Sequence, residues 1–393
     1  MYSVLEKMLS NSLESKFASS AKKYNKRGEL IISLGLGEPL FNTPKRVISK
    51  SNWAMLKGYT RYSNPKGLQQ LRSKIKNKLQ HENKIKVKSE NIIVTPGAKM
   101  AISLALMGIL RDGDEVINFY PSYPSYDNQI YLANRKTKIK KFNLNKKDFK
   151  IDFVKLKKSF SSKTKAIILN FPNNPTGKIL TKDEIYNLRK ILRKKKCWII
   201  SDEVYEHLNF SELKHYSFAS DPFLKKKCIT VNGFSKSHSM TGWRIGYLAA
   251  EDEKIIKLIN KIHQNLNTNV APFIQYAAIE CLNMNKKYLK VFNSKMKKNH
   301  ELLKRKLNKS KIFSLVPSKG ALFAFLNISK AKMKSDIFCY ELLKKFKVAT
   351  IPGFYFGLSW DDHVRISLAE NSKIFKEGIR RLMSFEKILL RKK

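Results

Sequence analysis

The sequence predicts an α/β fold built on a largely parallel sheet. Short apolar runs alternate with amphipathic stretches up to about residue 285, and this alternation is typical of βα units. Most of the apolar runs end in clusters of Gly, Pro, Asn or Ser, as strands do where they enter a loop. The chain has 393 residues, 42% of them hydrophobic, so it can bury a large core.

The apolar runs predict sheet strands at residues 91–95, 115–119, 166–170, 197–201, 228–232 and 245–249. Helices are expected between them at residues 98–110, 182–195 and 254–264.

The pattern changes after about residue 285. A long basic helix is expected at residues 286–307, then strands at 321–326 and 364–367 and helices at 335–346 and 373–389. We therefore predict a large domain over residues 41–285 and a smaller α+β domain over residues 286–393. The N-terminal segment, residues 1–40, is expected to pack with the small domain.

The charge is strongly positive, with 78 Lys and Arg against 31 Asp and Glu, a formal net charge of +47. Such a balance suggests a polyanionic partner. However, Lys greatly outnumbers Arg and is dispersed along the chain, whereas base readout and bidentate phosphate binding favour Arg. We therefore expect no specific nucleic-acid partner and interpret the excess of Lys as a codon-composition bias.

The cysteines and the apolar runs point to a cytoplasmic protein. The four cysteines are far apart and the histidines form no close pair, so neither a disulfide framework nor a metal site is expected. No apolar run reaches membrane-spanning length, and the N-terminus lacks the apolar region of a signal peptide. We expect no membrane association.

Candidate ligand-binding residues follow the predicted strands, because ligands of doubly wound folds lie beyond the carboxyl ends of the strands. Residues 91–95 are followed by a Pro-Gly turn, and a helix is expected to begin near Ala98 and Lys99. The free N–H groups at the start of a helix suit a phosphate. A plain helix cap is the alternative. Tyr123, after residues 115–119, would stack on a planar ring or form an ordinary aromatic corner.

The later strands are followed by groups of stronger chemical character. Asn174 lies in a rigid Pro-Asn-Gly turn. Asp202 ends an apolar strand, where a carboxylate needs a cationic partner, and Tyr205 is three residues away. Lys236 lies in a small-residue turn and is a candidate for imine chemistry, with Arg244 shortly after it. A structural turn and a helix N-cap are the alternatives for Asn174 and Asp202.

Together these segments resemble class I/II aminotransferases of fold type I, which depend on pyridoxal phosphate (PLP), and within them the prokaryotic aspartate aminotransferase subgroup. Nine matching segments follow the family's order and spacing. They are residues 33–39 (SLGLGEP), 59–62 (YTRY, with a Gly at 67), 95–98 (TPGA), 174–177 (NPTG), 201–205 (SDEVY), 235–236 (SK), 240–247 (MTGWRIGY), 351–353 (IPG) and 364–367 (VRIS). The resemblance implies a mostly parallel seven-stranded sheet in the large domain.

The resemblance assigns roles around the cofactor ring. Lys236 would form the Schiff base with PLP and then move the proton between the substrate Cα and the cofactor. Asp202 would pair with the pyridine nitrogen and keep it protonated. Tyr205 and Asn174 would contact the 3′-oxygen, and Tyr123 would stack on the ring.

The resemblance also implies how the phosphate is bound. The backbone N–H groups of Ala98 and Lys99 would hold it, with the Arg244 guanidinium as a charged donor. Gly233 stands where many relatives have a phosphate-binding Ser, and Ser235 is the candidate replacement.

On the substrate side, Arg365 would bind the α-carboxylate as a bidentate pair, with the Gly37 backbone, Tyr123 and Asn174 beside it. Lys99 would pair with the distal carboxylate of a dicarboxylic substrate. Many aspartate-specific relatives have Trp in place of Tyr123, so strict aspartate specificity is not implied.

Two further expectations concern the edges of the site. Tyr62 would reach the phosphate of a neighbouring subunit, so the expected assembly is a homodimer with a shared active site. Ser10 and Ser12 are candidates to border the side-chain pocket.

The expected activity is amino-group transfer by a ping-pong mechanism between an L-amino acid, aspartate or glutamate, and 2-oxoglutarate or oxaloacetate. Three alternatives stay open. They are a PLP lyase of the C–S β-lyase kind, an aminotransferase that prefers aromatic or prephenate-like substrates, and a basic nucleic-acid-binding protein with an inactive PLP fold. The intact set of Asp202, Lys236, Arg244 and Arg365 argues against the last.

Overall fold

The structure is a computed structural model that describes residues 30–39 and 41–391. The expectations for residues 1–29, including Ser10 and Ser12, lie outside the described residues.

The main sheet has seven strands in the order β2-β8-β7-β6-β5-β3-β4. Only β8 runs antiparallel to its neighbours, which confirms the mostly parallel seven-stranded sheet. The strands are β2 (Ile92–Thr95), β3 (Glu115–Tyr120), β4 (Lys138–Asn143), β5 (Thr164–Asn170), β6 (Trp198–Asp202), β7 (Cys228–Gly233) and β8 (Gly246–Ala250). Strand β4 was not predicted, because this edge strand is rich in Lys and mostly not buried.

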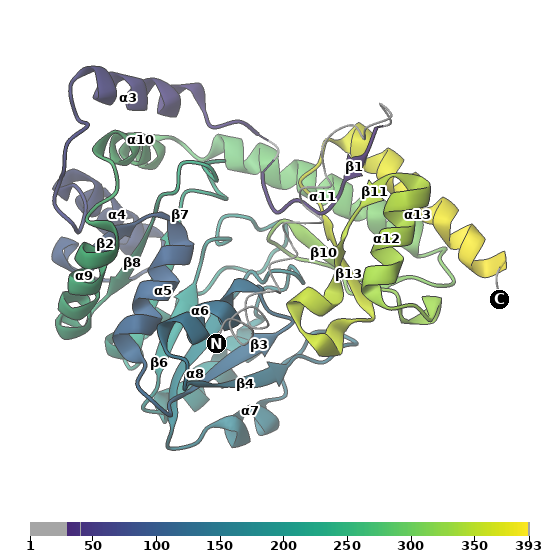
Figure 1. Cartoon of the computed structure of the whole chain (residues 1–393), viewed down its shortest axis with the longest axis horizontal. Helices are drawn as coiled ribbons and strands as arrows, with labels where there is room; N and C mark the ends of the chain where they lie inside the picture. The colour runs from purple at the N-terminus through teal and green to yellow at the C-terminus, as the bar shows by residue number, and fades with distance from the viewer. Residues whose placement is uncertain (1–29, 40, 392–393) are drawn as a thin grey trace.

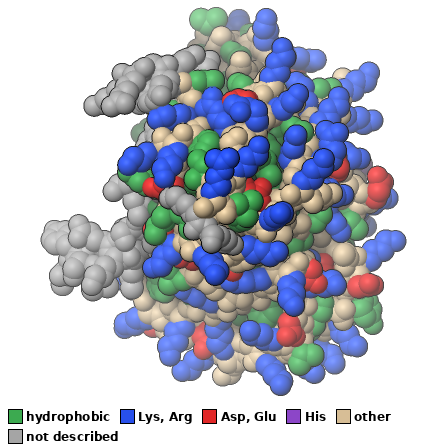
Figure 2. All heavy atoms as spheres, turned by 90° about the vertical axis from the view of Figure 1, so that its right-hand side faces the viewer, with side chains coloured by type: hydrophobic (Ala, Val, Ile, Leu, Met, Phe, Trp, Pro, Cys, Tyr) green, Lys and Arg blue, Asp and Glu red, His purple; other side chains and the backbone are tan. Residues whose placement is uncertain are grey.

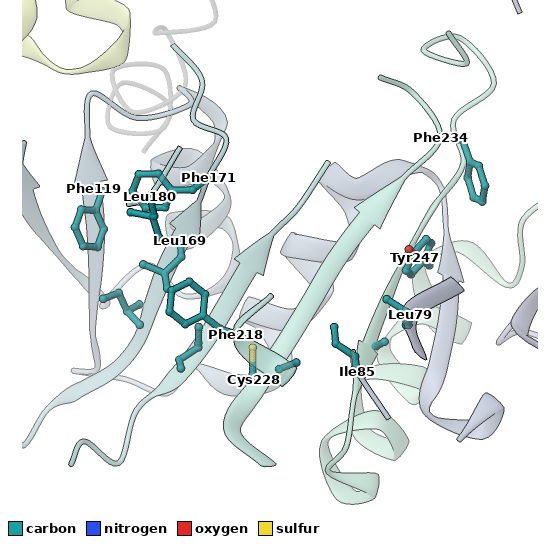
Figure 3. Close-up of a cluster of buried hydrophobic side chains, with 14 of the residues drawn as sticks. Leu79, Ile85, Phe119, Leu169, Phe171, Leu180, Phe218, Cys228, Phe234 and Tyr247 are labelled. Atoms are coloured by element: carbon teal, nitrogen blue, oxygen red, sulfur yellow. The ribbon is translucent and has the colours of Figure 1, made fainter. Parts of the chain in front are cut away.

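Helices cover both faces of this sheet. The cluster on one face joins the sheet to α5 (Gly97–Ile109), α6 (Ser125–Ala133) and α9 (Glu253–Asn267). The cluster on the other face includes residues of α3 (Lys45–Leu56), α4 (Gln69–Glu82), α7 (Phe153–Ser159), α8 (Lys182–Arg193) and α10 (Pro272–Asn283). Figure 3 shows part of this second cluster, from Phe119 on β3 to Tyr247 on β8.

Successive side chains of one strand point to opposite faces of the sheet and so belong alternately to the two apolar clusters. Ala166 and Ile168 of β5 belong to the first cluster, and Ile167 and Leu169 to the second. This alternation explains the continuous apolar runs that predicted the strands, since a parallel sheet is buried on both faces. The unpredicted helices α3 and α4 bury only a few side chains each. The rest of α4 is mostly polar, whereas α3 also carries apolar side chains at exposed positions, so neither shows a clear periodicity in the sequence.

The C-terminal part begins with α11 (Lys287–Leu307). It continues through β9 (Ser314–Leu315), β10 (Phe323–Asn327), α12 (Ser335–Phe346), β11 (Val348–Ala349), β12 (Ile351–Pro352), β13 (His363–Ser367) and α13 (Ser372–Arg391). An antiparallel sheet has the order β12-β13-β10-β9. Figure 1 shows α12, α13, β10 and β13 grouped to the right of the large sheet. Short 3₁₀ helices lie at Ser89–Asn91, Phe218–Ser220, Lys225–Lys227, Ser329–Ala331, Gly353–Phe356 and Leu358–Trp360.

The described end of the N-terminal segment joins this C-terminal part. Strand β1 (Ile32–Ser33) pairs in parallel with β11, and Ile32 and Leu34 lie in the same apolar cluster as α11, α12 and α13. The domain boundaries at residues 40 and 285 stay predictions.

The surface carries its positive charge in dispersed form. Figure 2 shows Lys and Arg side chains across the visible face with acidic side chains between them. Within residues 30–39 and 41–391, no helix combines the length and apolar character that crossing a membrane requires.

Candidate active site

A cavity of about 570 Å³ lies at the carboxyl ends of the central strands. The last residues of β5, β6 and β7, which are Asn170, Asp202 and Gly233, all line it. The segment at residues 35–38 and residues from β10 and β13 complete its wall. Of the predicted site residues that the structure describes, all but Tyr62 line it: Gly37, Ala98, Lys99, Tyr123, Asn174, Asp202, Tyr205, Ser235, Lys236, Arg244 and Arg365.

One end of the cavity fits a phosphate. Helix α5 begins there without a side-chain cap, so the N–H groups of its first turn are available to an anion. Gly97 has φ +81°, and a Cβ on it would lie 2.6 Å from Arg244 Nη2. A Cβ on Gly246 would lie 2.5 Å from the nitrogen of Ala98. Glycine is therefore required at both positions for the guanidinium and strand β8 to approach the start of the helix.

A buried carboxylate occupies the middle of the cavity. Asp202 is 5% exposed, and burial raises the pKa of its carboxyl to about 6. The Tyr126 hydroxyl donates to Oδ2 at 2.5 Å, and the Val204 N–H donates to Oδ1 at 3.3 Å. Both are neutral donors, so the carboxylate suits a cationic ligand group such as a protonated pyridine nitrogen.

The lysine lies within the same cavity. Lys236 follows β7 in a turn, and its ammonium donates to the Gly37 carbonyl at 2.7 Å. Nearby, the buried Tyr205 ring meets Phe323 edge-on, with centroids 6.0 Å apart. Lys99 Nζ lies 5.7 Å from the centre of the Tyr123 ring.

A buried guanidinium, that of Arg365, also lines the cavity. Arg365 is 1% exposed, and it donates to Asn174 Oδ1 at 3.0 Å and to the Gly35 carbonyl at 2.8 Å. Its guanidinium lies 4.3 Å from the Phe323 ring centre and 5.0 Å from that of Phe356. These contacts fix the plane of the guanidinium, which is what bidentate binding of a carboxylate requires.

Sequence reasoning missed Tyr126, Asn170 and Phe323, which also line the cavity. Tyr126 had a usable signal, because it lies only three residues after Tyr123, in the same aromatic segment that follows β3. Phe323 had none, because it reaches the site through the long-range pairing of β10 with β13. Tyr62 is 87% exposed and does not line the cavity of its own chain.

A phosphate cradle, a buried carboxylate and a lysine around one cavity are the parts of a PLP site of fold type I. Residues 29–382 match the family model of aminotransferase class I and II. An aspartate aminotransferase of Bacillus sp. strain YM-2 is 35% identical over 387 residues, which cover 97% of this chain and 98% of that protein.

Solved structures agree with this match. An aromatic aminotransferase from Pyrococcus horikoshii OT3 has a TM-score of 0.87 and 34% identity, and the match covers 96% of this chain and 99% of that one. An aspartate aminotransferase from Thermus thermophilus with maleate has a TM-score of 0.88 and 28% identity, covering 94% and 96%. The chain belongs to the class I/II aminotransferases, and its cofactor is PLP.

Proposed function

We propose that this aminotransferase acts on acidic amino acids, with aspartate or glutamate as donor and 2-oxoglutarate or oxaloacetate as acceptor, by a ping-pong mechanism. The observation that carries the proposal is that Lys99 and Arg365 line the same cavity. Two cations at one site suit a substrate with two carboxylates. The solved aspartate aminotransferase with maleate supports the same substrate class.

PLP, when bound, supplies an aldehyde that condenses with amines and a ring that withdraws electrons from the substrate Cα. We assign the rest to the chain. Arg365 would orient the α-carboxylate, and Lys236 would hold the cofactor and carry the proton of the substrate Cα. Asp202 would keep the ring nitrogen protonated, Tyr205 and Asn174 would contact the ring oxygen, and Tyr123 would cover the ring face.

The start of α5 completes the cofactor assignment. We assign the phosphate to the N–H groups of Ala98 and Lys99, to Arg244 and to the Ser235 hydroxyl. The uncapped helix start and the lining of the cavity support this assignment.

A second group of donors is favoured by the apolar lining of the cavity. Tyr123 and Phe323 line it, and so does Leu36, whose side chain is 37% exposed. These side chains offer apolar surface to an aromatic donor, and the similar structure from P. horikoshii is named an aromatic aminotransferase. We therefore propose aromatic amino acids as secondary donors. No contact of this kind favours a lyase.

Lys99→Ala tests the substrate assignment. We expect kcat/KM for aspartate to fall about 10- to 100-fold, because the distal carboxylate loses a cation worth about 1.4–2.8 kcal/mol, whereas phenylalanine is affected less than threefold. Donor panels under steady-state conditions give the comparison. The control is Lys138→Ala, which removes one charge from the exposed edge strand β4 and leaves both donors unchanged. Equal losses for both donors would contradict the assignment.

We also propose a homodimer with a shared active site. Exposed apolar side chains gather between residues 48 and 62, where Leu56 is 89% and Tyr62 87% exposed, and a second copy of the chain would cover them. Mixing inactive Tyr62→Ala and Lys236→Ala proteins tests this, because subunit exchange would assemble one intact site per mixed dimer. Light scattering must show a dimer, and activity must return on mixing. A monomer, or a mixture without activity, would rule out the shared site.

A cytoplasmic location stays a proposal. It is supported by the four cysteines, which are all buried free thiols and suit a reducing compartment. Cell fractionation tests it.

A further inference from the structure

We propose that Tyr126 is a positioning residue that fixes the orientation of the Asp202 carboxylate and keeps it charged, so that Asp202 can hold the pyridine nitrogen of the cofactor. The inference concerns the PLP site and rests on no assignment of substrate. A failure of the aspartate proposal would therefore leave it standing.

The contact between the two side chains is short and buried. Tyr126 is 2% exposed and Asp202 is 5% exposed. The hydroxyl donates to Oδ2 at 2.5 Å, whereas the Val204 N–H reaches Oδ1 only at 3.3 Å. Asn170 contributes from the backbone side, since its amide donates to the Asp202 carbonyl at 3.1 Å. The carboxylate plane therefore depends mainly on the Tyr126 hydroxyl.

The chemical type of this donor matters as much as its position. A cationic donor would neutralise Asp202 and compete with the ring nitrogen, and an apolar side chain would favour the protonated acid. A hydroxyl stabilises the carboxylate and leaves its negative charge for the ligand. Burial and the nearby Asp202 charge raise the pKa of Tyr126 well above its usual value, so the hydroxyl keeps its proton and stays a donor.

Helix α6 connects this contact to the other cofactor contacts. Tyr126 lies in the first turn of α6 and Tyr123 two residues before the helix begins, and their rings meet edge to face with centroids 5.4 Å apart. One turn further on, the Gln129 amide donates to the Lys99 carbonyl at 2.5 Å and to Ser103 Oγ at 2.9 Å, both on α5. The ring-stacking residue, the partner of Asp202 and the phosphate helix therefore form one connected unit.

Tyr126→Phe tests the proposal, because it removes one hydroxyl and keeps the ring that packs in the core. In the holoenzyme we expect little loss of PLP affinity at pH 8 and about fivefold weaker binding at pH 6, as follows from a rise of about one unit in the pKa of Asp202 from about 6. The loss is expected to grow as the pH falls toward 6, because Asp202 then protonates more readily. PLP release is measured by equilibrium dialysis, and kcat is expected to fall with little change in KM.

A thermodynamic cycle separates positioning from packing. If Tyr126 acts through Asp202, then adding Tyr126→Phe to Asp202→Asn weakens PLP binding no further. Tyr131→Phe on the same helix is the control and leaves PLP binding unchanged. Thermal unfolding of each variant checks that the fold is retained. Wild-type PLP affinity and pH profile in Y126F, or an equal loss in the D202N background, would overturn the proposal.

Discussion

Asp202 and Glu206 are two buried carboxylates only four residues apart, and they differ in whether a cationic side chain is paired with them. Asp202 lines the larger cavity, and among the described residues its carboxylate accepts hydrogen bonds from two neutral donors, the Tyr126 hydroxyl and the Val204 N–H. Glu206 lines a second, smaller cavity and forms an ion pair with the buried Lys78 ammonium. Asn83 and Asn232 also donate to Glu206, at 2.6 and 2.7 Å.

The pKa values follow from this difference. Burial raises the pKa of Asp202 to about 6. Burial would also raise the pKa of Glu206, but the Lys78 ammonium holds it well below its usual range. Glu206 thus has a counterion in direct contact, whereas the Lys236 charge acts on Asp202 without forming an ion pair among the described residues and only partly offsets the effect of burial. A buried carboxylate whose pKa stays raised because no paired cation offsets its burial therefore marks the site.

Exchanging each carboxylate for its amide gives the largest expected contrast. Asp202→Asn should lower kcat/KM by about a thousandfold or more, about 4 kcal/mol, because an amide cannot keep the ring nitrogen protonated. Glu206→Gln should lower it less than tenfold, since Glu206 touches neither cofactor nor substrate in this assignment. Single-turnover kinetics at saturating PLP measures both. Similar losses in the two variants would remove the distinction between them.

Removing the counterion of Glu206 should cost mainly stability. Lys78→Met leaves a buried carboxylate unpaired, and we expect a loss of about 3–5 kcal/mol in the free energy of unfolding, measured by urea denaturation. Adding Glu206→Gln should recover part of this loss, because no uncompensated charge then remains. If K78M unfolds like the wild type, then Lys78 is not the counterion of Glu206.

The same comparison predicts opposite effects on the stability of the cofactor-free protein. Because the pKa of Asp202 rises from 3.8 to about 6 on folding, the stability of wild-type protein falls as the pH rises through this window. At pH 7 Asp202→Asn should therefore be the more stable form, by about 1–3 kcal/mol, with the gap closing near pH 4. Glu206 contributes in the opposite direction, because its lowered pKa adds stability above its usual value of 4.5 that is lost as the pH falls.

Thermal scans of cofactor-free protein from pH 4 to 8 check these signs. Adding PLP should reverse the order for Asp202, because the wild type then gains a cation that Asp202→Asn cannot bind as well. Stabilisation of the cofactor-free protein by Glu206→Gln at pH 7 would contradict the comparison.

Local sequence patterns predicted much of the fold and most of the proposed site. Buried strands appear as apolar runs, and Asp202 and Lys236 follow such runs directly, so their placement at the carboxyl edge needed no tertiary information. Elements that bury little, such as β4 and α4, gave too few apolar residues to be recognised. Tyr62 stays untested by a single chain, because its predicted role lies in a second subunit.

The sequence by itself determined which chemical groups reach the carboxyl ends of the strands, because strand ends and turns depend on neighbouring residues. The tertiary structure decided which of the buried charges are compensated. Lys78 reaches Glu206 across 128 positions of the chain, and Tyr126 reaches Asp202 across 76. The packing of α4 and α6 against the sheet brings these partners to the two carboxylates. The pKa of a buried group depends on such contacts rather than on its neighbours in the chain.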